Sequence, residues 1–69
     1  MKAAPNRLRV LRAERRMSQM DAADKAGLSL NRYWRIENSY VDPTSEERIA
    51  LASVLAVDVP DVFPHRRIA

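Results

Sequence analysis

Helix start and stop signals lie close together along this 69-residue chain and limit the length of any helix that it can form. Ser18 followed by Asp21, and Thr44 followed by Glu47, have the spacing of a capping box, in which both side chains accept backbone N–H groups at a helix start. Gly27 can adopt the left-handed conformation that ends many helices. Little room is left between these signals, and no stretch alternates apolar and polar residues for long enough to predict a strand. We therefore expect short helices and an all-α fold.

Apolar residues at helical spacing divide the chain into five predicted helices. They run from Asn6 to about Arg16, from Ser18 to Gly27, from Ser29 to about Asn38, from Thr44 to Leu55, and from Asp58 to Phe63. Such short helices bury too little apolar surface singly, so their apolar faces are expected to share one core. We expect a single domain over 1–69, with a compact core over 6–64 and a loose basic tail over 65–69. The residues assigned to the core are Leu8, Leu11, Met17, Ala22, Ala23, Ala26, Leu28, Tyr33, Ile36, Ile49, Ala52, Leu55 and Phe63.

Composition excludes several classes of function. The chain has no Cys, which excludes disulfides, zinc–thiolate sites and Cys nucleophiles. The one His, His65, lies in the last five residues, and the one Gly cannot form a Gly-rich phosphate loop. We expect no enzymatic activity, no cofactor, no metal and no small-molecule substrate.

The charges are unevenly distributed along the chain. Residues 1–40 carry nine basic and four acidic side chains, whereas residues 41–64 carry one basic and five acidic ones. A basic first part and an acidic second part favour a polyanion bound on one face, although solvated helix surface is the alternative interpretation. No apolar run is long enough to span a bilayer, and the N-terminus lacks a signal peptide, so a cytoplasmic protein is expected.

The stretch Met17–Ser29 resembles the helix-turn-helix of the lambda-repressor/Cro (XRE-like) family. The similarity lies in Ser18-Gln19 at the opening of the second helix, Ala22 within it, Gly27 in the turn, Ser29 at the next helix start, and the closing Ile36-Glu37-Asn38. It extends over about residues 7–64. The resemblance implies a five-helix lambda-repressor-like fold that binds double-stranded DNA as a homodimer, with the third helix in the major groove.

The resemblance also implies roles for single residues. Arg12 and Glu37 match a structural ion pair between the first and third helices. At about 100° per residue, Asn31 and Arg35 point outward together, whereas Tyr33 points inward. Asn and Arg can read adenine and guanine through paired hydrogen bonds. The candidate base-reading residues are Leu30, Asn31, Trp34 and Arg35, and the candidate phosphate contacts are Gln19, Ser29, Arg32, Asn38 and Tyr40.

Two residues and the function itself leave alternatives open. Leu30 touches either a thymine methyl group or the edge of the core, and Trp34 packs on DNA, on a neighbouring helix or on a partner. The leading hypothesis is a sequence-specific transcriptional regulator acting as a repressor. The alternative is an antitoxin-like or co-activator-like module that binds another protein, such as a toxin, with DNA contact secondary.

Overall fold

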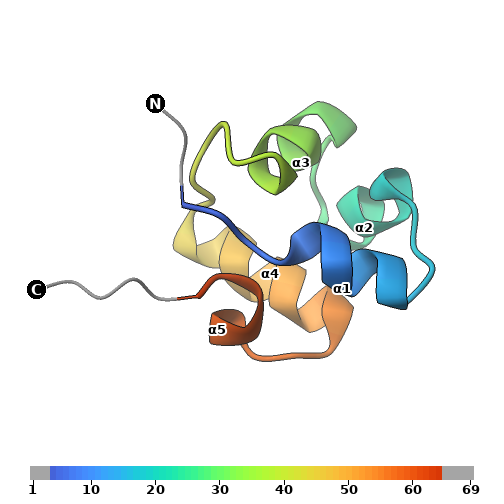
Figure 1. Ribbon diagram of the computed structural model, residues 1–69. Coiled ribbons are helices and arrows are strands. Elements are labelled where there is room, and N and C mark those ends of the chain that lie inside the picture. Colours follow the sequence, from blue (N-terminus) through green and yellow to red (C-terminus); the bar gives the residue numbers. More distant parts are fainter. Residues whose placement is uncertain (1–3, 65–69) are drawn as a thin grey trace, which may run out of the picture.

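Five helices form the part of the chain that the computed structural model describes, residues 4–64 (Figure 1). They are α1 (Leu8–Glu14), α2 (Gln19–Ala26), α3 (Leu30–Glu37), α4 (Ser45–Leu55) and α5 (Val59–Val62), and these residues contain no strand. The α4 helix packs against α2 and α5, and α2 packs against α3. The prediction of an all-α, five-helix fold is confirmed. The expected basic tail lies outside the described residues.

Local capping explains where α2 and α4 begin. Ser18 Oγ accepts the Asp21 N–H at 3.0 Å, and the Asp21 carboxylate accepts the Ser18 N–H at 3.2 Å. Thr44 and Glu47 form the same reciprocal pair, at 3.1 and 2.8 Å. These bonds satisfy N–H groups that have no partner inside the helix. The two predicted capping boxes are confirmed.

The first helix is shorter than the predicted span 6–16. The helix begins at Leu8, and Arg7 occupies the N-cap position. Asn6, one residue earlier, accepts the Leu8 N–H through its Oδ1 at 2.9 Å. The helix ends at Glu14, and Arg16 then turns the chain with a φ of 55°.

Four residues of the described chain have positive φ, and each follows a helix. Gly27, after α2, has a φ of 75° and confirms the predicted left-handed stop. Arg16, Ser39 and Ala56 follow α1, α3 and α4 with φ values of 55°, 62° and 60°. These three residues carry a Cβ, which makes the left-handed conformation unfavourable for them.

The core draws on all five helices. Its buried apolar residues are Leu8, Leu11, Ala22, Ala23, Tyr33, Ile36, Leu51, Ala52, Leu55 and Val62. The assignment of Ile49 to the core is wrong, because its side chain is 62% exposed. The Leu51 and Val62 side chains are buried instead, and Met17, Ala26, Leu28 and Phe63 pack at the edge of the core. No helix in residues 4–64 is long and apolar enough to cross a membrane.

Candidate nucleic-acid interface

The turn between α2 and α3 sets α3 at the surface of the domain. The Leu28 N–H donates to the Ala23 carbonyl at 2.8 Å, which closes the end of α2, and the Leu28 side chain packs against the core. Ser29 Oγ then accepts the Arg32 N–H at 3.0 Å and starts α3. Only Gly27 and Leu28 separate α2 from the residue that caps α3. The two helices are therefore joined by a short and well-defined connection.

One side of α3 is buried and the opposite side is open to solvent. Tyr33, Ile36 and Glu37 are buried, as their helical spacing predicts. Asn31 and Arg35 are exposed and stand one turn apart, so their side chains are neighbours on the helix surface. Within residues 4–64, neither of these two side chains has a hydrogen-bond or ion-pair partner. Their donors and acceptors face solvent.

Leu30 and Trp34 extend this open side with apolar surface. Their exposed fractions are 41% and 43%, so each side chain keeps part of its surface open to solvent. The Trp34 ring stacks on Tyr40, with ring centroids 5.4 Å apart and an angle of 15° between the planes. Tyr40 is itself fixed through its N–H, which donates to the Arg35 carbonyl at 2.8 Å. The two rings line an open cleft of about 410 Å³ beside Arg35.

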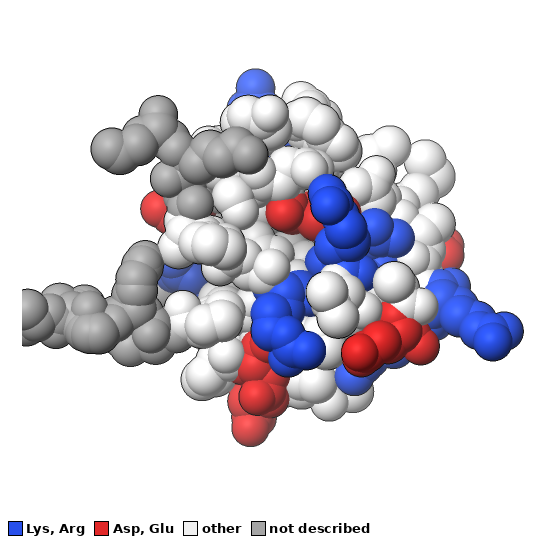
Figure 2. Space-filling view, viewed as in Figure 1, with Lys and Arg blue, Asp and Glu red and all other residues white. Residues whose placement is uncertain are grey.

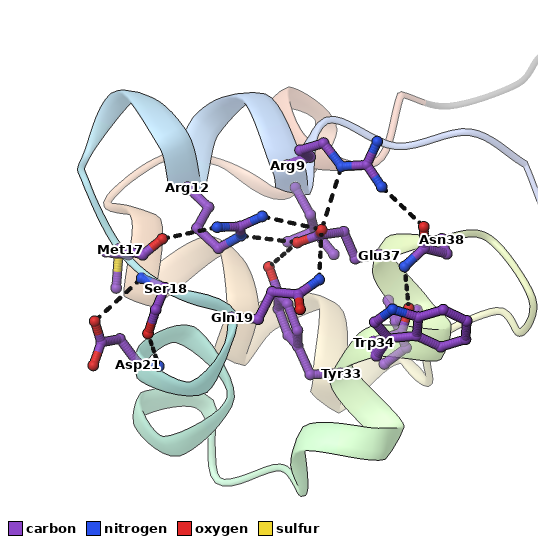
Figure 3. Close-up of polar contacts among 12 residues, drawn as sticks. Arg9, Arg12, Met17, Ser18, Gln19, Asp21, Tyr33, Trp34, Glu37 and Asn38 are labelled. Carbon is purple, nitrogen blue, oxygen red and sulfur yellow. Dashed lines mark hydrogen bonds and ion pairs between the residues drawn. The ribbon is translucent and has the colours of Figure 1, made fainter.

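A buried carboxylate joins α3 to α1. The Glu37 side chain is fully buried and accepts from Arg12 Nε at 2.9 Å and from Arg12 Nη2 at 3.2 Å (Figure 3). Tyr33 donates its hydroxyl to Glu37 Oε1 at 2.6 Å, and Arg12 Nη1 donates to the Met17 carbonyl at 2.9 Å. The network links α1, the start of α2 and α3. The network therefore fixes how α3, the helix that carries Asn31, is rotated about its axis and how closely it packs against α1.

Ionisation within this network follows from its contacts. Burial alone would raise the pKa of Glu37, but hydrogen bonds from Arg12, Tyr33 and Gln19 outweigh it and hold that pKa below its usual value. The hydrogen bond to Glu37 raises the pKa of Arg12. Burial, and then the hydrogen bond to Glu37, raise the pKa of Tyr33. The pair is therefore ionised, and the tyrosine neutral, near pH 7.

Three of the candidate phosphate contacts donate side-chain N–H groups to acceptors within the protein. Gln19 Nε2 donates to Glu37 Oε2 at 3.0 Å. Arg32 donates to both carboxylate oxygens of Glu47 on α4, at 2.8 and 3.0 Å, and this contact lowers the pKa of Glu47. Asn38 donates to the Trp34 carbonyl at 2.9 Å. Nothing in the sequence signals these bonds, since the first two join residues 15 or more positions apart.

Charge on the surface is mixed. Figure 2 shows Lys and Arg side chains lying among acidic ones on the face that it draws. The Arg32–Glu47 pair contributes to this mixing, because it joins a basic residue of the first part of the chain to an acidic residue of the second. Within residues 4–64, no group of three or more His, Asp or Glu side chains is arranged to hold a metal ion.

Comparison with known families gives the chain its class. A family model described as a helix-turn-helix domain matches residues 6–63, which is most of the chain. The protein therefore belongs to this helix-turn-helix domain family, as the resemblance in the sequence predicted. No curated protein matches the chain. Helix-turn-helix domains are DNA-binding modules.

Proposed function

We propose that the protein is a transcriptional repressor that binds a specific double-stranded DNA sequence with α3 in the major groove. The observation that carries this proposal is the open side of α3, where Asn31 and Arg35 stand one turn apart without partners among residues 4–64. The opposite side of the same helix is locked to the core through Tyr33, Ile36 and Glu37. A rigid helix with uncommitted polar side chains suits the reading of base edges.

Each exposed residue of α3 has a role that its chemistry supports. Arg35 pairs with guanine O6 and N7, and Asn31 pairs with adenine N6 and N7. Leu30 and Trp34 offer apolar surface to thymine methyl groups. The stack on Tyr40 holds the indole of Trp34 in one orientation, which reduces the entropy lost when DNA binds.

Phosphate contacts flank this reading surface. Ser29 lies at the N-terminus of α3, where backbone N–H groups and the helix dipole favour an anion. Gln19 keeps one amide hydrogen beyond its bond to Glu37. Asn38 and Tyr40 lie just beyond the other end of α3. Arg32 is the weakest member of the set, because its charge is already paired with Glu47 and only its remaining N–H groups are left for a phosphate.

A homodimer would read two half-sites about one helical turn of DNA apart, on a roughly palindromic operator. Occupation of a promoter by such a dimer excludes polymerase without any further activity. The protein would act in the cytoplasm and associate with the nucleoid when bound. Mass measurement in solution, with and without operator duplex, tests the dimer: one protomer per duplex containing a complete palindrome contradicts it.

The experiment that tests base reading is a selection from random duplex DNA followed by affinity measurements on single-base variants of the selected site. Arg35→Ala should cost about 1–3 kcal/mol on the selected site and remove discrimination at one base pair. Lys25→Ala is the matched control, because it removes the same charge from the exposed end of α2. An equal loss for Arg35→Ala on the selected site and on random DNA contradicts base reading.

A second candidate function is supported by the exposed Trp34–Tyr40 stack. Aromatic residues are enriched at protein interfaces, and an antitoxin-like module would use such a pair to bind a partner protein such as a toxin. The substitution Trp34→Ala distinguishes the two functions. Weakened binding to the selected duplex assigns the stack to DNA, whereas unchanged DNA affinity together with loss of a co-purifying partner assigns it to that protein.

A further inference from the structure

The first turn of α1 brings a basic side chain to the edge of the candidate interface. Arg9 Nη2 donates to Asn38 Oδ1 at 2.9 Å, and Arg9 Nε lies 3.5 Å from Glu37 Oε2 (Figure 3). The Arg9 side chain is nevertheless 65% exposed. It therefore reaches from α1 to the C-terminal end of α3 across the surface, and no pattern in the sequence distinguishes it from the other basic residues of α1.

Three polar side chains from three parts of the fold meet at this point. Glu37 Oε2 accepts from Arg9 at 3.5 Å and from Gln19 at 3.0 Å, so these two donors flank one oxygen atom. Asn38, which caps the end of α3, is bonded to Arg9 from the other side. Arg9 thus lies between two residues that the sequence already suggests as phosphate contacts.

The balance of charge leaves Arg9 with an uncommitted positive charge. The buried carboxylate of Glu37 is already neutralised by Arg12, which donates to it at 2.9 and 3.2 Å. Arg9 meets that carboxylate only through one long, partly exposed contact. A guanidinium has five N–H donors, so most of those of Arg9 face solvent. The remaining amide hydrogens of Gln19 and Asn38 add neutral donors beside it.

We propose that Arg9, Gln19 and Asn38 together bind one phosphodiester group of the DNA backbone, with Arg9 as its charged ligand. Arg and amide side chains are common donors to backbone phosphates, and the charge-assisted bond is the strongest of them. Glu37 is a positioning residue here, because it orients Arg9 and Gln19 without touching the phosphate. This inference rests on the proposed function, since it locates a backbone contact for the duplex that α3 reads.

Salt dependence of binding tests the charged contact. Affinity of wild type, Arg9→Ala and the control Lys25→Ala is measured from about 50 to 300 mM KCl on the selected duplex and on a scrambled one. Arg9→Ala should weaken binding to both duplexes about tenfold and reduce the slope of log K against log salt by about 1. Lys25→Ala should leave the slope unchanged. A slope for Arg9→Ala equal to that of wild type overturns the phosphate site while leaving the proposed function in place.

A scan of neutral phosphates locates the contact independently of any effect on folding. Duplexes that carry a single methylphosphonate at successive backbone positions are titrated with wild type and with Arg9→Ala. Wild type should bind more weakly when the methylphosphonate lies at one position in each half-site. The affinity of Arg9→Ala should not change when the methylphosphonate lies at that position. If the variant remains as sensitive as wild type at every position, Arg9 touches no phosphate. If wild type binds no duplex at all, both this site and the proposed function are wrong.

Discussion

Replacing Glu37 with Gln should destabilise the protein strongly, even in the absence of DNA. The substitution keeps the shape of a fully buried side chain but removes its charge and turns one acceptor oxygen into a donor. That donor then faces N–H and O–H groups of Arg12, Gln19 and Tyr33, which are themselves donors. Arg12, whose side chain is only 16% exposed, loses its counter-charge.

The magnitude follows from the burial of the pair. Breaking a buried ion pair by removing one partner costs about 3–5 kcal/mol, and the partial exposure of Arg12 favours the lower end. For a domain of this size, a loss of about 3 kcal/mol lowers Tm by roughly 12–24 °C. A chain of this length has a total stability of only about 3–10 kcal/mol, so a large part of it depends on this one carboxylate.

Thermal and urea unfolding followed by circular dichroism measure the effect. The matched control is Glu47→Gln, because the Glu47–Arg32 pair is more exposed than the Glu37 pair, at 17% and 33%, and Gln at that position can still complete the capping box with Thr44. A partly exposed pair of this kind should contribute less than the buried pair, about 1 kcal/mol. Equal changes in Tm for the two variants would refute the argument that burial makes the Glu37 pair important.

Three further predictions concern the same framework. The pKa of Glu37 is lower in the folded protein than its usual value of 4.5, so the stability that its ionised form contributes is fully present above about pH 4.5 and is lost as the pH falls through the lower folded-state value. Urea unfolding at a series of pH values should therefore show a steeper acid loss for wild type than for Glu37→Gln, and parallel curves would contradict this. Tyr33→Phe keeps the core packed but leaves Glu37 without its 2.6 Å hydroxyl donor, and should cost about 1–3 kcal/mol in urea unfolding; no change would mean that the other donors suffice. Gly27→Ala should cost about 1 kcal/mol through backbone strain alone, because a Cβ there meets no atom within 4 Å, and an unaltered Tm would count against the left-handed turn.

Features encoded by neighbouring residues could be predicted from the sequence. The capping boxes that start at Ser18 and Thr44, and the stop at Gly27, depend on residues at most three positions apart, and all three are present. The inward face of α3 also followed from helical spacing, because its apolar and polar sides are well separated. Arg12 and Glu37 came from a resemblance and not from spacing, since residues on separate helices carry no periodic signal.

Ile49 shows where periodicity fails. The α4 helix has apolar residues on more than one side, so its sequence does not identify the face that the core covers. At about 100° per residue, Ile49 lies roughly 160° from Leu51, whereas Leu55 lies only about 40° from it. Packing against α2 and α5 covers the Leu51–Leu55 side and leaves Ile49 in solvent. The bonds of Gln19, Arg9 and Arg32 were missed for a similar reason, because each depends on how separate helices come together.

The four left-handed residues differ in what holds them in place. Gly27 adopts its conformation readily, so the link between α2 and α3 is encoded by the local chain itself. Arg16, Ser39 and Ala56 favour theirs less, so each depends on the backbone hydrogen bonds that close the end of the helix before it. A peptide spanning only α2 and α3 would therefore keep a stronger preference for its bend than peptides spanning Arg16, Ser39 or Ala56 would for theirs. Of the connections among the described helices α1 to α5, the one between α2 and α3 is thus the one whose direction the local chain favours most strongly.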